Sequence, residues 1–177
     1  PVRLQLPGRH NVSNALAAIA VGLACELSLA DITAGLASVV PTAGRGARVA
    51  GLAGSVLIDD TYNANPGSVR AAIDLLAGCS GRRTLVLGAM LELGAGSEQM
   101  HRELGVYARE RGIQRFVGVG SALQGAVQAF GGDWYADCDG AADALRGELD
   151  AEDTVLIKGS RGAAMERLLA ALRETGN

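Results

Sequence analysis

Aromatic side chains make up only 3% of the 177 residues, although 49% of the residues are hydrophobic. A core of this composition must be built mainly from Ala, Val, Leu and Ile, which suits helices packed closely against a sheet. No apolar run of about 18 or more residues is free of charge and glycine, so we expect no insertion into a membrane. The net charge is −3 and like charges form no run, so neither nucleic acid nor an anionic membrane surface is an expected partner.

Cysteines are few and scattered, at positions Cys25, Cys79 and Cys138. An odd number at such spacing fits neither a zinc site nor a disulfide framework. We therefore expect small buried thiols in a reducing cytoplasm, and a cytoplasmic protein. The N-terminal stretch "PVRLQLPGRHN" has no signal-peptide pattern and no initiator Met, so we expect the chain to be part of a longer protein.

Lysine is almost absent. Of the 16 basic residues only Lys158 is a lysine, and all the others are arginine. A coding preference for arginine explains the others but not the exception, because an ammonium is a compact point charge that a guanidinium cannot copy. By itself the pattern is weak evidence that position 158 requires an ammonium.

The N-terminal 40 residues read as helical. The segment "HNVSNALAAIAVGLACEL" predicts a mostly buried helix from Val12 to Leu27. The segment "ITAGLASVV" predicts a second helix, with Asp31 as its N-cap and Pro41 after its end. The next stretch, "PTAGRGARVAGLAG", is rich in glycine and has no apolar periodicity, which predicts a linker.

From about residue 48 onward, short apolar runs alternate with helical segments. We predict strands at 55–60, 83–89, 115–120, 133–136 and 153–159, and helices at 66–77, 97–111, 122–130, 141–149 and 163–173. This alternation predicts the α/β class, with a doubly wound, mostly parallel sheet and helices on both faces. Ligands bind such sheets outside the carboxyl ends of the strands, so the residues that follow each apolar run are the candidates for a site.

The run "IDDTYNANP" follows one of these predicted strands. Asp59 and Asp60 are adjacent, so their side chains should point to opposite faces of the sheet. One can then reach the ligand edge while the other ties down a neighbouring loop. A carboxylate at a strand end is also well suited to accept hydrogen bonds from sugar hydroxyls.

The rest of the same run divides into two groups. Asn65 and Pro66 have a purely structural explanation as the N-cap and first residue of the next helix. Asp60, Tyr62 and Asn63 have no capping role and are therefore candidates for binding a ligand.

The segment "KGSRGAAME" has the same layout at the last predicted strand end. Gly159 and Gly162 allow close backbone approach, Ser160 can cap the next helix, and Lys158 and Arg161 add positive charge. One interpretation is a surface turn with an ordinary cap, and the other is a receptor for a carboxylate or phosphate. It is not a P-loop, because the upstream glycine of that motif is absent.

Other candidate motifs are weaker. "GVGSALQG" misses the third glycine of a dinucleotide-binding fingerprint, which is Leu123 here. His10 and His101 are far apart and have no cluster of carboxylates nearby, so no metal site is expected in these residues. Glu92, in "MLELGAGSE", lies in a glycine-rich loop at the ligand edge, and Ser97 can start the next helix.

Five segments in order resemble the Mur ligases of bacterial cell-wall synthesis: "PGRHNVSNALAA", "AGR", "IDDTYNANPGS", "LGAMLELGAGSE…H" and "KGSRGAAME". The resemblance covers nearly the whole chain. It implies that 1–40 are the C-terminal helices of a central ATP-binding domain, that 41–48 are a linker, and that 49–177 are a C-terminal α/β ligase domain.

The resemblance also implies an activity and its partners. It implies a ligase that uses ATP and Mg²⁺ to join D-alanyl-D-alanine to UDP-N-acetylmuramoyl-tripeptide through an acyl phosphate, in peptidoglycan precursor synthesis. The P-loop and the metal ligands are expected upstream of these residues, so the fragment alone should be inactive. We expect a monomer. The alternatives are another Mur or folylpolyglutamate-type amino-acid ligase, or a non-catalytic nucleotide-binding module.

The resemblance assigns roles to individual residues. The nucleotide is expected to contact Asn11, Asn14, Arg45, Asp60, Tyr62 and Asn63, and the incoming dipeptide is expected near Glu92, Lys158, Ser160 and Arg161. Tyr62 stands where some relatives carry a lysine. Ala89 stands where related ligases commonly carry an aspartate, so any contact made by that carboxylate is lost here.

Overall fold

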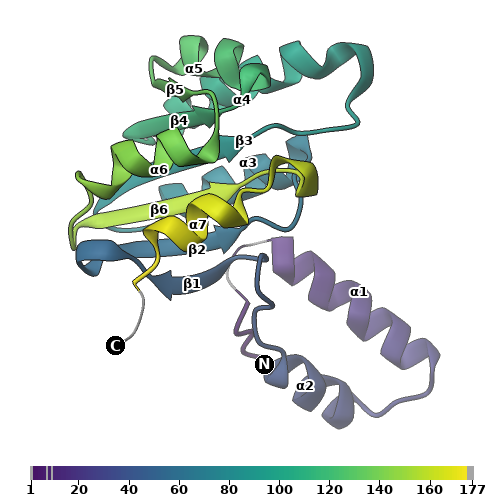
Figure 1. Cartoon of the computed structure of the whole chain (residues 1–177). Coiled ribbons are helices and arrows are strands. Elements are labelled where there is room, and N and C mark those ends of the chain that lie inside the picture. The colour runs from purple at the N-terminus through teal and green to yellow at the C-terminus, as the bar shows by residue number, and fades with distance from the viewer. Residues whose placement is uncertain (1, 7, 9, 175–177) are drawn as a thin grey trace. The chain divides into compact units, whose positions relative to one another are not determined.

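A computed structural model describes residues 2–6, 8 and 10–174 (Figure 1). The chain divides into two compact units, Pro1–Thr42 and Ala43–Asn177, and each is described by itself. The first unit contains two helices and the second contains a six-stranded sheet with its covering helices.

The first unit is built from α1 (His10–Ala24) and α2 (Leu29–Ser38). The prediction that Asp31 caps the second helix was wrong, because α2 begins at Leu29 and Asp31 lies in its first turn. Ser28 is the N-cap, and its hydroxyl accepts a hydrogen bond from the Asp31 N–H at 3.1 Å. The expected burial of α1 is also wrong, since Leu16 and Val21 are exposed.

The second unit is organised by its sheet, in the order β1-β2-β6-β3-β4-β5. β1 pairs with β2 in antiparallel fashion and every other neighbouring pair is parallel. The predicted α/β class with a mostly parallel sheet is confirmed. The strands are β1 (Ala47–Ala50), β2 (Val56–Asp60), β3 (Arg82–Gly88), β4 (Arg115–Val119), β5 (Asp133–Tyr135) and β6 (Asp153–Lys158).

Helices cover both faces of this sheet, as the alternating pattern predicted (Figure 1). One face packs against α3 (Pro66–Ala77), α4 (Ser97–Glu110) and α5 (Gln124–Phe130). The other packs against α6 (Cys138–Arg146) and α7 (Glu166–Leu172). Short 3₁₀ turns complete the unit: η1 (Leu52–Gly54), η2 (Gly94–Gly96), η3 (Ser121–Leu123) and η4 (Arg161–Ala163).

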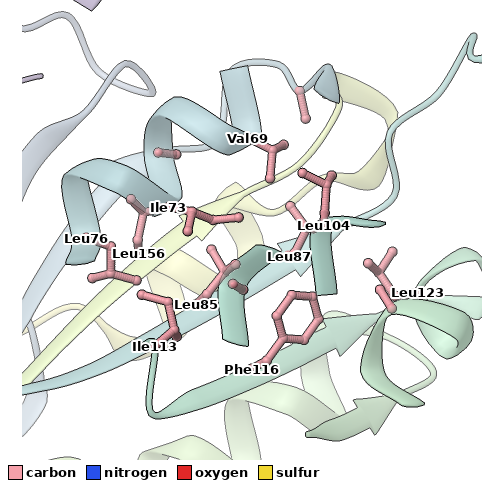
Figure 2. Packing of buried hydrophobic residues seen from close by; sticks show 14 of the residues in the cluster. Val69, Ile73, Leu76, Leu85, Leu87, Leu104, Ile113, Phe116, Leu123 and Leu156 are labelled. Atoms are coloured by element: carbon pink, nitrogen blue, oxygen red, sulfur yellow. The ribbon is translucent and has the colours of Figure 1, made fainter. Parts of the chain in front are cut away.

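Alternation along the central strands divides the core between the two faces. In β3, Leu85 and Leu87 lie in the cluster with α3 and α4, whereas Val86 lies in the cluster with α6 and α7. Figure 2 shows the first cluster, in which Phe116 is the one aromatic side chain labelled among aliphatic neighbours such as Ile73. The core is therefore aliphatic, as the composition predicted.

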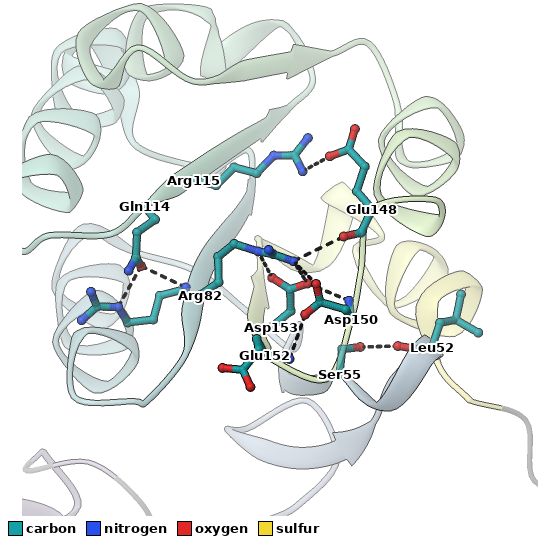
Figure 3. A network of polar contacts seen from close by, with 10 residues as sticks. Leu52, Ser55, Arg82, Gln114, Arg115, Glu148, Asp150, Glu152 and Asp153 are labelled. Carbon is teal, nitrogen blue, oxygen red and sulfur yellow. Dashed lines mark hydrogen bonds and ion pairs between the residues drawn. The ribbon is translucent and has the colours of Figure 1, made fainter.

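A charged network ties the amino ends of β3 and β6 together, at the edge of the sheet opposite to the strand ends that were predicted to bind a ligand (Figure 3). Arg82 donates to both carboxylate oxygens of the buried Asp153 at 2.6 and 2.5 Å and to Asp150 at 2.9 Å. The Glu152 N–H, and then Arg82, lower the pKa of Asp150 below its ordinary value. This network therefore links the start of β3 to the start of β6 and to the turn that precedes it.

The region predicted as a linker contains regular structure. β1 starts at Ala47, inside the 41–48 range, and η1 follows at Leu52–Gly54. A short edge strand among glycines has little apolar pattern of its own, and its pairing with β2 supplies the hydrogen bonds that local sequence does not reveal.

Candidate functional site

Three loops meet at the carboxyl ends of β2, β3 and β6, because the topology places β6 between the other two strands. A pocket of about 550 Å³ lies among these loops. Its volume is within the range of about 300–1,000 Å³ that is common for small-molecule sites. The lining residues come from all three loops: Tyr62, Asn63, Ala64, Asn65, Leu91, Glu92, Leu93, Ser160, Arg161 and Gly162.

The structure thus brings together five of the residues predicted from the sequence: Tyr62, Asn63, Glu92, Ser160 and Arg161. Leu91 and Leu93 add apolar surface that sequence reasoning did not single out. A pocket with one carboxylate, one guanidinium and apolar walls has the chemistry to hold a small zwitterion. The placement follows from the general rule that parallel strands end at the same edge of a sheet.

Asp59 ties down a loop, as one of the two adjacent aspartates was predicted to do. Its buried carboxylate accepts hydrogen bonds from the Gly44 N–H at 2.7 Å and from the Thr61 hydroxyl at 2.7 Å. A third, longer contact runs from the Thr61 N–H at 3.3 Å. Because Gly44 immediately precedes Arg45, Asp59 fixes the backbone that carries this predicted nucleotide-binding arginine.

Asp60 faces the other way and meets Lys158. The lysine Nζ donates to Asp60 Oδ2 at 2.6 Å and to the Asn63 carbonyl oxygen at 2.8 Å. The side chain of Lys158 is 3% exposed, whereas that of Asp60 is 22% exposed. The two residues are direct partners in the β2–β6 register. The ammonium therefore lies against residues 60–63, and Asp60 is the member of the pair that solvent can reach.

The Ser160 side chain does not cap the α-helix that follows, so that part of the sequence interpretation was wrong. Its hydroxyl donates to the Ala64 carbonyl oxygen at 3.2 Å and accepts from the Leu91 N–H at 2.9 Å. Ser160 is followed by η4 and by Ala164 in a left-handed conformation, and α7 begins only at Glu166. The "KGSR" segment therefore joins the loops after β2 and β3, and it leads into a 3₁₀ turn rather than an α-helix.

Tyr62 connects two arginines at the rim of the site. The guanidinium carbon of Arg45 lies 4.2 Å from the centre of the Tyr62 ring, and that of Arg161 lies 5.8 Å from it. A tyrosine face attracts cations through its quadrupole. The half-exposed ring thereby holds two positive charges near one another.

His101 is a residue whose role sequence reasoning missed. It is fully buried, its Nε2 accepts from the Met90 N–H at 2.9 Å, and its Nδ1 is 2.7 Å from the Ser97 carbonyl oxygen. These partners require the proton on Nδ1. His101 thus fixes the start of the loop that carries Glu92, whose φ of 62° lies in the left-handed region.

Ala89 takes part in the site through its backbone. Its carbonyl oxygen accepts the Ser160 N–H at 3.0 Å, so the loop after β3 is joined to the loop after β6 without any side chain at position 89. The loss of a carboxylate at this position leaves that backbone contact in place.

Asn11 and Asn14 belong to the first unit. They lie on consecutive turns of α1, and Asn14 Nδ2 donates to Asn11 Oδ1 at 3.1 Å. Both amides therefore lie on one side of the helix near its start. Their predicted contact with a nucleotide stays a prediction.

A doubly wound sheet with a pocket at its carboxyl edge defines the class of α/β domains in which ligands bind at the strand ends. Residues 44–161 match the family described as "Mur ligase, glutamate ligase domain". The chain belongs to the Mur ligase family.

Individual relatives carry a more specific name. The chain is 44% identical to the UDP-N-acetylmuramoyl-tripeptide–D-alanyl-D-alanine ligase of Escherichia coli (strain K12), over 99% of this chain and 39% of that protein. It is 34% identical to the enzyme of the same name from Haemophilus influenzae, over 98% of this chain and 40% of that protein. The chain thus spans about two fifths of the length of these curated relatives.

Solved structures agree with this relationship. A crystal structure of MurF from Acinetobacter baumannii superposes with a TM-score of 0.88 at 37% identity, covering 96% of this chain and 38% of that one. MurF from Thermotoga maritima in complex with ADP gives a TM-score of 0.79 at 26% identity, covering 94% of this chain and 38% of that one. A folylpolyglutamate synthase from Mycobacterium tuberculosis, at 18% identity and a TM-score of 0.71, shares the fold.

Two further observations concern the described residues only. Within this part of the chain, no group of three or more His, Cys, Asp or Glu side chains is placed to hold a metal ion. None of the described helices has the length and apolar character needed to cross a membrane.

Proposed function

We propose that the chain is part of an ATP-dependent ligase that joins D-alanyl-D-alanine to UDP-N-acetylmuramoyl-tripeptide through an acyl phosphate, in peptidoglycan precursor synthesis. One observation carries the proposal: the three strand-end loops form one pocket whose lining offers both a carboxylate, Glu92, and a guanidinium, Arg161. The 44% identity to the E. coli ligase of that name supports the same substrate class.

The nucleotide is proposed to bind at the carboxyl end of β2, on one side of the pocket. Asp60 is partly exposed at a strand end, as a carboxylate that accepts from ribose hydroxyls must be. Arg45 and Tyr62 offer a guanidinium stacked on a ring, which suits contact with phosphate or base. Asn63 lines the pocket beside them, and Asn11 and Asn14 are assigned to the adenine side. ATP supplies the phosphoryl group that activates the tripeptide carboxylate.

The chain spans about two fifths of the length of its curated relatives, and we propose that the ligands of Mg²⁺ lie upstream of these residues in the full-length protein. We likewise propose that the full-length protein acts as a monomer and that the reaction takes place in the cytoplasm, since both ATP and a UDP-linked precursor are cytoplasmic compounds.

The dipeptide belongs between the loops after β3 and β6. Arg161 presents a planar guanidinium, which can bind the dipeptide carboxylate with two parallel hydrogen bonds. Glu92 lines the same pocket and can attract the ammonium at the other end. That ammonium must lose a proton before its nitrogen attacks the acyl phosphate. Ser160 contributes by holding the two loops together.

The experiment measures phosphate release by the full-length enzyme from ATP, UDP-N-acetylmuramoyl-tripeptide and D-Ala-D-Ala. The proposal is supported if phosphate release requires D-Ala-D-Ala and if neither single amino acids nor folate with glutamate can take the place of the dipeptide. Release with another amino acid in place of the dipeptide would assign the chain to a different ligase. No nucleotide-dependent release with any acceptor would favour a non-catalytic nucleotide-binding module.

The assignment of Arg161 has its own test in the same assay. We expect Arg161→Ala to raise the KM for D-Ala-D-Ala by about tenfold or more, the loss of a charge-assisted hydrogen bond, and to leave the KM for ATP nearly unchanged. Arg167→Ala is the matched control, because this exposed arginine pairs with the exposed Asp139 and is not one of the residues that line the pocket. If the wild type prefers the dipeptide acid to its C-terminal amide and Arg161→Ala keeps that preference, Arg161 is not the carboxylate partner.

A further inference from the structure

Lys158 has an unusual position for a lysine at the edge of a pocket. Its side chain is 3% exposed, it lies at the end of the central strand β6, and both partners of its Nζ are on the segment that follows β2. These partners are the Asp60 carboxylate at 2.6 Å and the Asn63 carbonyl oxygen at 2.8 Å. The pocket lining contains the neighbouring Ser160 and Arg161.

Burial decides what this ammonium can do. A buried charge is tolerated only when it is paired and hydrogen-bonded, since its desolvation is costly. Both needs are met here by Asp60 and Asn63, so an ammonium directed at a dipeptide would have to leave its partners and cross to the pocket. A lysine also fits where an arginine would not, because its point charge needs no room for a planar fork.

We propose that Lys158 is a positioning residue for the nucleotide side of the site: it orients the Asp60 carboxylate and holds the Asn63 backbone, and it does not receive the dipeptide carboxylate. The inference rests on the proposed function and deepens it. Ser160 lies two residues beyond Lys158 and bonds to the Ala64 carbonyl oxygen and the Leu91 N–H. The end of β6 therefore also joins the loop after β2, on the nucleotide side, to the loop after β3, on the dipeptide side.

The test compares three variants of the full-length enzyme: Lys158→Met, Asp60→Asn and the double variant. Met keeps the length of the lysine stem and removes the charge. We expect Lys158→Met to raise the KM for ATP by about tenfold and the KM for D-Ala-D-Ala by less than about threefold. In the Asp60→Asn background the same substitution should change the KM for ATP by less than about twofold, because residues that act through one contact are not additive.

A matched control separates positioning from a general weakening of the sheet. Arg82→Met removes the partner of Asp153, a buried carboxylate that lies at the opposite end of β6 from Lys158 (Figure 3). We expect Arg82→Met to lower the Tm while leaving both KM values unchanged. The double variant Asp60→Asn/Lys158→Met removes both charges together, so it stays informative if Lys158→Met alone does not fold.

Two results would overturn the inference. One is a rise in the dipeptide KM with an unchanged KM for ATP in Lys158→Met, which would make Lys158 a dipeptide ligand. The other is full additivity of Lys158→Met and Asp60→Asn, which would show that the lysine does not act through Asp60. Failure of the proposed function itself looks different, because then the wild type releases no phosphate in response to D-Ala-D-Ala.

Discussion

The Asp59 carboxylate offers a sharp test of how the site is held. It is buried and accepts two hydrogen bonds of 2.7 Å, from the Gly44 N–H and the Thr61 hydroxyl. A hydrogen bond to a charged group contributes about 1.5–3 kcal/mol, so Asp59→Ala should lower the free energy of unfolding by roughly 3–5 kcal/mol. Part of that loss is the cost of leaving the Gly44 N–H without a partner.

Asp59→Asn should lower the free energy of unfolding much less than Asp59→Ala, because an amide can keep both short hydrogen bonds. The amide oxygen can accept from the Gly44 N–H while the amide NH₂ donates to the Thr61 hydroxyl oxygen, since a hydroxyl can both donate and accept. Only the longer 3.3 Å contact from the Thr61 N–H and the charge are then lost. We expect this variant to lower the free energy of unfolding by roughly 1–2 kcal/mol.

The assay is urea denaturation followed by the fluorescence of Trp134, the single tryptophan, which reports on the second unit. Asp143→Ala is the control, because Asp143 forms an exposed pair with Arg146 that should contribute less than about 1 kcal/mol. Equal costs for Asp59→Asn and Asp59→Ala would refute the hydrogen-bond argument. So would a cost for Asp59→Ala no larger than that of the control.

Two further predictions concern packing and thiol chemistry. Gly105→Ala should destabilise the second unit by more than about 2 kcal/mol in the same urea assay, because the added Cβ would lie 2.1 Å from the Ala126 backbone oxygen. Gly125→Ala is the control: its added Cβ would have nothing within 4 Å, so it should stabilise the unit by about 0.5–1 kcal/mol. A similar effect of both substitutions would contradict the contact between α4 and α5. Burial raises the pKa of the Cys138 thiol, so its contribution to stability is fully present below the unfolded pKa and is lost as the pH rises through the folded pKa. A thiol reagent should label the exposed Cys25 at once and Cys138 only on unfolding, and equal labelling rates in the folded protein would show that Cys138 is accessible.

Elements with local signals were predictable from the sequence. The helix α3 has the predicted bounds, Pro66–Ala77, because Asn65 supplies the cap and Pro66 the first helical residue. The side chains of Asn65 and Ser68 complete a reciprocal capping box. In contrast, β1 was read as part of a linker, because a four-residue edge strand depends on its partner β2 rather than on its own pattern.

The site was predictable to the level of the sheet edge but not of side-chain direction. The strand-end rule placed Glu92, Lys158 and Arg161 near one another without any knowledge of strand order. Whether Lys158 points into the pocket or across to Asp60 depends on the β2–β6 register, which no local pattern encodes. His101 was considered only as a metal ligand, and its role in holding the loop was missed because its partner, the Met90 N–H, lies outside its own helix.

The place of β6 in the sheet has a consequence for how the protein is made. Of the six described strands, β6 is the last to be synthesised, yet it is the strand that pairs with both β2 and β3 and so joins the pair β1–β2 to the group β3–β4–β5. Until residues 153–158 leave the ribosome, β2 and β3 each present an unpaired edge, and such edges invite pairing with other chains. A nascent chain therefore depends on β6 both to complete this sheet and to protect the earlier strands from aggregation.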